Sequence, residues 1–195
     1  MKNYFMGIIL LLSLFGNGLW GQELPVVSIF YYSKTGNTKA MAESAKRGAE
    51  SVDSVTVHLY SVEEAKSEHL LEADAIIVGS PVYKANIAPP VIQFINTWPF
   101  EGTPLKDKVG AAFVTAGGIS AGEELVQMNI LQAMLLHGMI IVGGPDWKGA
   151  FGASAITSEK PFNLDSTDGQ VQEQFLKKAA SLGKRVALLA KRLKI

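Results

Sequence analysis

The chain has 195 residues, 48% of them hydrophobic, and it contains no cysteine. This length and apolar content suit one domain with a complete core once a leader is removed, and the lack of cysteine excludes disulfides, thiolate nucleophiles and cysteine-based metal sites. The 18 basic residues balance the 18 acidic ones, so we expect no nucleic-acid partner and no strongly charged one.

Residues 1–21 are predicted to be a secretory signal peptide rather than part of the fold. Lys2 precedes an uncharged apolar run over residues 4–15, and Gly16-Asn17-Gly18 and the small residue Gly21 follow, which is the layout of such a signal. The run of about a dozen residues is shorter than the roughly 20 needed to span a bilayer. We therefore expect cleavage after Gly21, a domain over residues 22–195, and an exported, periplasmic or other extracytoplasmic location. An uncleaved leader would instead anchor the domain to the membrane.

Short apolar runs alternate with helical patterns along the rest of the chain. The runs are mostly continuous in hydrophobicity, as in parallel strands buried on both faces, and the strict alternation indicates a doubly wound α/β sheet. We expect strands over residues 26–32, 55–60, 75–79, 109–115 and 139–143, and helices over residues 39–52, 62–71, 89–97, 123–137 and 169–194.

The last predicted helix is amphipathic. One apolar stripe along it would cover the sheet, and basic pairs at residues 177–178, 184–185 and 191–192 would form its solvated face. The alternative is a basic amphipathic helix that lies on an anionic membrane.

The segment Ser33-Lys34-Thr35-Gly36-Asn37-Thr38 stands between the first strand and the first helix. Hydroxyls and the unpaired amides of a helix start converge there on one anion, and the helix dipole favours negative charge. The segment lacks the Gly-Lys-Ser/Thr ending of a nucleoside triphosphate loop and the three-glycine spacing of a dinucleotide fingerprint. It therefore predicts a phosphate site of another kind, although the same residue types also cap ordinary turns.

Two more unusual loops follow the third and fourth predicted strands. Residues 79–90 form a proline-rich turn that presents Tyr83 to a flat heteroaromatic ligand. Residues 115–122 are rich in glycine, which lets backbone amides approach a ring edge. Ligands of doubly wound sheets bind at the carboxyl ends of the strands, where the strand order reverses, so the three loops are expected to form one site.

Together these segments resemble the flavodoxin-like superfamily, and within it the FMN-dependent NAD(P)H:quinone oxidoreductases of the tryptophan-repressor-binding-protein type. The resemblance covers residues 26 to about 190 and includes the segments 137–143 and 149–154. It implies a three-layer sandwich with a five-stranded parallel sheet of order 2-1-3-4-5 and helices on both faces. It also implies a homo-oligomer, either a dimer or a tetramer.

The resemblance further implies FMN as the cofactor, NADH or NADPH as electron donor, and a quinone or other small electron acceptor as partner. Two-electron hydride transfer through flavin N5 needs no dedicated acid or base, so no catalytic residue is assigned, and His137 is only a candidate flavin contact. No metal site is expected. The residues that match the family's cofactor site are Ser33, Lys34, Thr35, Gly36, Asn37 and Thr38 at the phosphate, Pro81, Val82, Tyr83, Lys84 and Asn86 beside the ring, and Thr115, Ala116, Gly117, Gly118, Ile119 and Ser120 along its pyrimidine edge.

Other interpretations stay open from the sequence. Export favours a one-electron carrier or FMN-binding redox module without nicotinamide activity, whereas the near-neutral charge disfavours it, because electron-carrying flavodoxins are typically strongly acidic. A domain that binds no flavin and serves in protein interactions is a third interpretation. Residues 144–167, which include Trp147 and Phe151, are too long for a plain connector and suit a lid or an oligomer contact.

Overall fold

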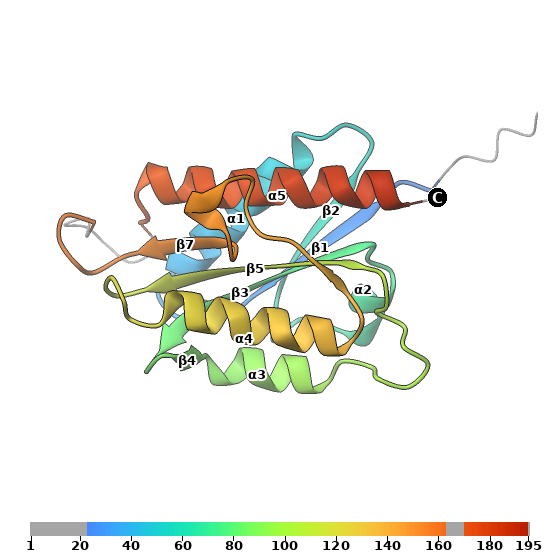
Figure 1. The fold of residues 1–195 in the computed structure, drawn as a ribbon, viewed down its shortest axis with the longest axis horizontal. Helices are drawn as coiled ribbons and strands as arrows, with labels where there is room; N and C mark the ends of the chain where they lie inside the picture. The colour runs from blue at the N-terminus through green and yellow to red at the C-terminus, as the bar shows by residue number, and fades with distance from the viewer. Residues whose placement is uncertain (1–22, 163–169, 195) are drawn as a thin grey trace, which may run out of the picture.

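The computed structural model describes residues 23–162 and 170–194, so the predicted signal peptide lies outside the described residues. The strands are β1 (Val26–Tyr31), β2 (Thr56–Ser61), β3 (Ala75–Tyr83), β4 (Asn86–Ile87), β5 (Val109–Ala116), β6 (Ile140–Ile141) and β7 (Ala153–Ile156). The helices are α1 (Asn37–Glu50), α2 (Ser67–Leu71), α3 (Pro89–Asn96), α4 (Glu123–Leu136) and α5 (Glu173–Leu193), with a 3-10 turn over Trp147–Gly149 (Figure 1). No helix in this part of the chain is long and apolar enough to cross a membrane.

The sheet confirms the predicted doubly wound α/β class. Its order is β2-β1-β3-β5-β6, with β7 also paired to β5 and β4 paired to β3. The fifth position is divided between two short strands, because β6 pairs with the start of β5 and β7 with its end, both in parallel. The single strand expected over residues 139–143 is therefore only two residues long, and the chain leaves the sheet edge at Gly143 before it returns at Ala153.

Two element boundaries differ from the expected ones for local reasons. β3 runs four residues beyond Gly79 and turns back as an antiparallel hairpin with β4. α2 begins at Ser67 rather than at residue 62, because a turn precedes it. In that turn Glu64 N donates to Ser61 O at 3.1 Å, and the Ser61 hydroxyl donates to the Glu64 carboxylate at 2.9 Å.

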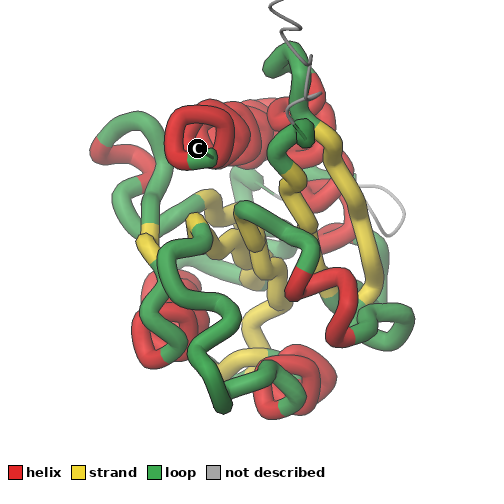
Figure 2. Tube along the Cα trace, turned by 90° about the vertical axis from the view of Figure 1, so that its right-hand side faces the viewer, coloured by secondary structure: helices red, strands yellow, loops and turns green. Residues whose placement is uncertain are grey.

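Helices cover both faces of the sheet, as the expected three layers require. Figures 1 and 2 show α1 and α5 on one face and α3 and α4 on the other. Successive strand residues point to opposite faces: Ile29 packs with Met41 and Leu182 under α1 and α5, whereas Phe30 packs with Met134 on the α3 and α4 side.

Glycines let α1 and α5 pack backbone against backbone. A Cβ on Gly48 of α1 would lie 1.9 Å from Ala180 O, and a Cβ on Gly183 of α5 would lie 1.9 Å from Ala45 O. Real side chains do not tolerate such contacts, so both positions require glycine for this close approach. The long last helix is thereby fixed directly over the first one.

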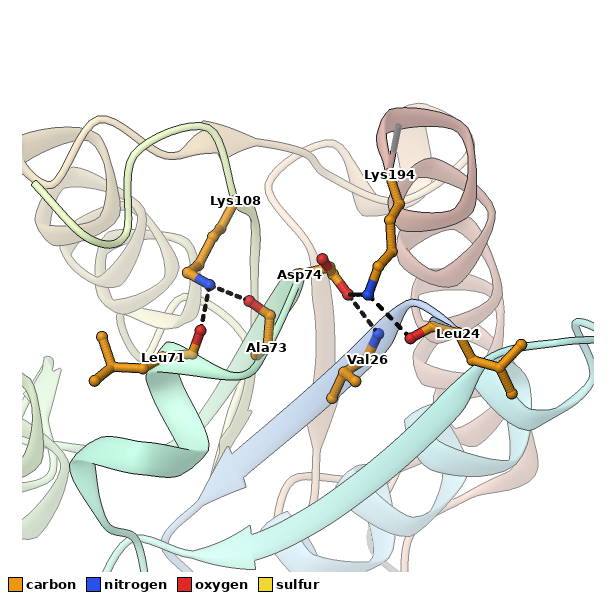
Figure 3. Close-up of polar contacts among 7 residues, drawn as sticks. All are labelled: Leu24, Val26, Leu71, Ala73, Asp74, Lys108 and Lys194. Atoms are coloured by element: carbon orange, nitrogen blue, oxygen red, sulfur yellow. Dashed lines mark hydrogen bonds and ion pairs between the residues drawn. The ribbon is translucent and has the colours of Figure 1, made fainter. Parts of the chain in front are cut away.

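Polar contacts fasten the end of α5 to the edge of the sheet where β1 and β3 begin (Figure 3). The Asp74 carboxylate accepts hydrogen bonds from Val26 N at 2.7 Å and from Lys194 Nζ at 2.9 Å. Lys194 Nζ also donates to Leu24 O at 3.1 Å, and Lys108 donates to the carbonyls of Leu71 at the end of α2 and of Ala73 just before β3. Partial burial lowers the pKa of Lys108. This edge is structural, and the opposite edge carries the loops singled out by the sequence.

Candidate cofactor site

The loop between β1 and α1 has the features of a phosphate site. Gly36 is the N-cap of α1 with φ 87°, and it offers no side chain to cap the helix. The Ser33 hydroxyl is buried and has no hydrogen-bond partner among the described residues. An unpaired buried hydroxyl costs about 1–3 kcal/mol, which a ligand oxygen would relieve. The Asn37 side-chain amide donates to the Thr35 hydroxyl at 3.4 Å, so both side chains share one side of this loop, where Lys34 is exposed.

A buried hydrogen bond joins the end of this loop, at the start of α1, to strand β5. The Thr38 and Thr115 hydroxyl oxygens lie 2.8 Å apart, and the two residues are 2% and 5% exposed. Tyr32 N also donates to Gly79 O of β3 at 3.2 Å. The phosphate loop and the start of α1 are therefore fixed to β3 and β5 by contacts within the protein itself.

The loop after β3 is the β3–β4 hairpin. Lys84 and Ala85 at its tip have φ values of 52° and 59°, a left-handed conformation that costs non-glycine residues of the order of 1–3 kcal/mol. The Asn86 side-chain amide donates to Lys84 O at 2.9 Å, so this amide, expected to contact the ring, closes the turn. At the hairpin base the buried Ser80 hydroxyl accepts from Ala88 N at 3.0 Å.

The hairpin presents an aromatic surface beside an open hollow. Tyr83 is 37% exposed, and its ring meets the Tyr32 ring edge-on with centroids 6.5 Å apart. Burial, and then the neighbouring Tyr32 hydroxyl, raise the pKa of Tyr83. The hollow has a volume of about 710 Å³ and is lined by Val82, Tyr83, Lys84, Asn86, Ile87, Pro89 and Ile92. Pro81 precedes this stretch and pairs in the sheet with Thr115.

The glycine-rich loop after β5 is held by carboxylates. Ile119 N donates to a Glu159 carboxylate oxygen at 2.6 Å, and Ser120 N donates to a Glu123 carboxylate oxygen at 3.2 Å. The second Glu123 oxygen is buried without a partner among the described residues. Two of the amides expected at the pyrimidine edge are thus engaged by carboxylates in this structure. Gly117 and Gly118 follow Ala116 directly and form the start of this loop.

The segment after β7 completes this edge of the site. Thr157 N donates to Ala116 O at 2.9 Å, and Ser158 N donates to Gly117 O at 3.0 Å. Glu159 follows and reaches the β5 loop. The sequence does not predict this segment or Glu159. Both follow β7, a short edge strand without a clear hydrophobic pattern.

The loops also touch one another. Gly122, with φ 101°, lies so close to Ala85 that an added Cβ would be 2.8 Å from the Ala85 Cα. The β5 loop is therefore packed against the β3–β4 hairpin. The three loops predicted from the sequence meet at one edge of the sheet.

The structure does not bring His137 to this edge. α4 starts at the β5 loop and runs to the opposite edge, where its C-cap His137 packs against Trp98 and Phe100 at centroid distances of 5.5 and 5.4 Å. Burial lowers the pKa of His137 from 6.5, and a hydrogen bond with the Pro99 backbone partly offsets this. The length of α4 thus separates His137 from the three loops of the candidate site, and His137 lies at the end of this helix.

The residues present fit the phosphate end of FMN. The Ser33 hydroxyl, which is buried and has no partner within residues 23–162 and 170–194, lies together with a glycine N-cap and the positive end of α1. Beside them lie the exposed Tyr83 ring and the loop after β5. A bound FMN would thus have its phosphate at an oxyanion site and its ring beside an aromatic side chain and polar groups of the loops.

Comparisons with known proteins agree with this arrangement. The family model described as NADPH-dependent FMN reductase matches residues 31–153. An "NAD(P)H dehydrogenase (quinone)" of Archaeoglobus fulgidus is 32% identical, over 86% of this chain and 98% of that protein. A "Flavodoxin" of Aquifex aeolicus is 33% identical, over 63% of this chain and 67% of that protein. The crystal structure described as a flavodoxin, WrbA-like protein from Agrobacterium tumefaciens, superposes with a TM-score of 0.69, at 22% identity over 88% of this chain and 99% of that one.

Proposed function

This chain belongs to the NADPH-dependent FMN reductase family, and we propose that it is an FMN-dependent NAD(P)H:quinone oxidoreductase. The observation that carries the proposal is the buried Ser33 hydroxyl before α1, which has no hydrogen-bond partner in the described part of the chain and lies inside the segment that matches the family. The similarity to a quinone-type NAD(P)H dehydrogenase along 98% of that protein's length supports the choice of activity.

Each part of the site has a separate task in this proposal. Ser33, Thr35 and the first-turn amides of α1 bind the phosphate, and the Thr38–Thr115 hydrogen bond keeps that loop in register with β5. The exposed Tyr83 ring shields one side of the bound ring from water, and the backbone of Gly117 and Gly118 lies along its polar edge. When bound, FMN supplies the two-electron redox chemistry. The protein's contribution is to orient the two substrates in succession against the same ring.

The direct test uses protein saturated with FMN under anaerobic conditions. NADH or NADPH should bleach the flavin absorbance, and benzoquinone should restore it over many turnovers. Bleaching by neither nicotinamide, with FMN bound, would contradict the proposal. Comparison of the two nicotinamides also gives the preferred electron donor.

A one-electron carrier is the second candidate function, because proteins named flavodoxin are among the relatives of about one-third identity. The balance of acidic and basic residues argues against it, since docking to basic partners favours an acidic carrier. Reduction by dithionite, together with no reduction by either nicotinamide, would select the carrier.

Export through the leader is part of the proposal. β1 begins at Val26, so cleavage after Gly21 would leave every strand of the sheet intact. A fusion of residues 1–25 to a reporter that is active only after export should give signal, and N-terminal sequencing of the mature chain should begin at Gln22. An inactive reporter would contradict export, and an intact leader on an active fusion would indicate the membrane anchor.

The outer face of α4 supports a homo-oligomer. Val126, Ile130 and Met134 on one side of the helix are buried in the core, yet Leu125 and Leu136 on the other side are 54% and 70% exposed. Large apolar side chains exposed near both ends of a surface helix favour contact with another protein surface. Light scattering of the purified chain should give a mass above one subunit, and L125K/L136K should lower it.

A further inference from the structure

The chain between β6 and β7 forms a compact projection, here called the excursion loop, residues 143–152. Gly144 N donates to Gly149 O at 2.6 Å and Gly152 N to the same carbonyl at 2.9 Å. The Asp146 carboxylate accepts from Lys148 N at 2.9 Å. A Cβ on Gly143 would lie 1.9 Å from the Ala150 carbonyl oxygen. The loop is therefore folded tightly on itself and is already rigid without a ligand.

A polar stripe of α5 faces this loop. Gln174, Lys177, Lys178 and Ser181 are spaced i, i+3, i+4 and i+7, which places them on one side of the helix. One turn further on, the Arg185 guanidinium donates to Gly143 O at 3.2 Å and also to Gly144 O. Arg185 thus fastens the excursion loop to α5. Lys177 and Lys178, one of the basic pairs predicted for a solvated face or a membrane surface, line part of a cavity instead.

The cavity between the excursion loop and α5 has a volume of about 320 Å³, within the usual range for small-molecule sites. Its charged lining is Lys148, Lys177 and Lys178 with the carboxylate of Asp146. These side chains carry two positive charges in excess, in a chain whose overall charge is balanced. None of the three lysines forms an ion pair within residues 23–162 and 170–194. Lys148 instead lies over the Trp147 ring, 5.8 Å from its centroid.

We propose that this cavity binds a dianionic phosphate group, carried by a soluble phosphate ester or by a lipid headgroup. Ammonium groups that line one cavity repel one another, and a shared phosphate oxyanion offsets that repulsion with charge-assisted hydrogen bonds. The two negative charges of one dianion match the excess positive charge of the lining. The lining of the cavity includes no residue of the 33–38 loop, so this is a second anion site and goes beyond the proposed function.

The test uses full-length protein saturated with FMN, so that the 33–38 loop is already occupied. Inorganic phosphate is titrated at constant ionic strength while the amide signals of Gly144 and Gly149 and the indole N–H of Trp147 are followed by NMR. Trp147 is 82% exposed and Trp98 is 5% exposed, so the Trp98 indole serves as an internal reference. Saturable shifts in the excursion loop are expected, with Trp98 unchanged.

The matched variants are K177Q/K178Q, inside the cavity, and K184Q, on the same helix but not among its lining residues. The first should weaken phosphate binding by about tenfold or more, and the second by less than about twofold. A phosphate affinity that K177Q/K178Q leaves unchanged would overturn the proposal.

Sedimentation with vesicles separates the two sources of phosphate. Vesicles of phosphatidylcholine with phosphatidic acid are compared with phosphatidylcholine alone. Binding that requires phosphatidic acid and is lost in K177Q/K178Q assigns the lipid headgroup. Saturable inorganic phosphate binding without that vesicle dependence assigns the soluble ester. The absence of both saturable phosphate shifts and K177Q/K178Q-sensitive vesicle binding overturns the site.

Discussion

The hydroxyl oxygens of Thr38 and Thr115 lie 2.8 Å apart although 77 residues separate them in the chain. Thr38 is in the first turn of α1 and Thr115 is near the end of β5, so their hydrogen bond joins the phosphate loop to the loop along the polar edge of the ring. The sequence predicts both residues as cofactor contacts. In the structure the two side chains bind each other, and this contact positions two parts of one site.

This pairing predicts strong coupling between two conservative substitutions. Thr38→Val or Thr115→Val alone leaves one buried hydroxyl without its partner, and each should lower the free energy of unfolding by about 1–3 kcal/mol. The double variant removes both polar groups and should lose clearly less than the sum. Urea unfolding of the four FMN-free proteins measures this, and additive losses would show that the contact contributes nothing.

Ser33→Ala should separate stability from ligand binding. In the FMN-free protein the substitution removes a buried hydroxyl that has no partner among the described residues, so the free energy of unfolding should stay level or rise. FMN affinity should fall by about ten- to a hundredfold, because one hydrogen bond to a charged phosphate is worth about 1.5–3 kcal/mol. Calorimetric FMN titration and urea unfolding test the two halves. An unchanged FMN affinity would remove Ser33 from the site.

Gly183→Ala should destabilise the fold even though alanine is the better helix former. The gain in helix propensity is about 1 kcal/mol, but the new methyl group would stand 1.9 Å from Ala45 O. Overpacking of this kind typically costs about 1–3 kcal/mol, and here backbone atoms must move, so a net loss is expected in urea unfolding. Lys184→Ala, at the exposed neighbouring position, is the control and should be close to neutral. A Gly183→Ala protein as stable as the parent would refute the close helix contact.

His137 should make stability depend on pH in the mildly acidic range. Its folded-state pKa lies below 6.5 because the ring is partly buried, so below pH 6.5 the unfolded chain binds more protons than the folded chain. The free energy of unfolding should therefore fall as pH falls from 6.5 toward the lowered pKa. His137→Asn should flatten this slope in urea unfolding at several pH values. An identical slope in the parent and the His137→Asn protein would exclude this cause.

The parts of the fold that the sequence predicts are those with strong local patterns. Continuous apolar runs identify β1, β3 and β5, and a Gly-containing hydroxyl-rich turn identifies the phosphate loop. The sequence does not predict β7, because β7 is a four-residue strand at an edge position that it shares with β6. Asn86 and Glu159 show a second limit: their partners, Lys84 O and Ile119 N, depend on a strained hairpin tip and on a contact 40 residues away. Such interactions follow from the folded geometry rather than from residue type and spacing.

The central claim is that the loop between β1 and α1 binds the phosphate of FMN. The most direct measurement compares the affinities of the FMN-free protein for FMN and for riboflavin, which lacks the phosphate, by quenching of flavin fluorescence. FMN should bind at least about 100-fold more tightly, since two or more charge-assisted hydrogen bonds depend on the phosphate, and S33A/T35A should remove most of that difference. Equal affinities for the two flavins in the parent protein would contradict the account.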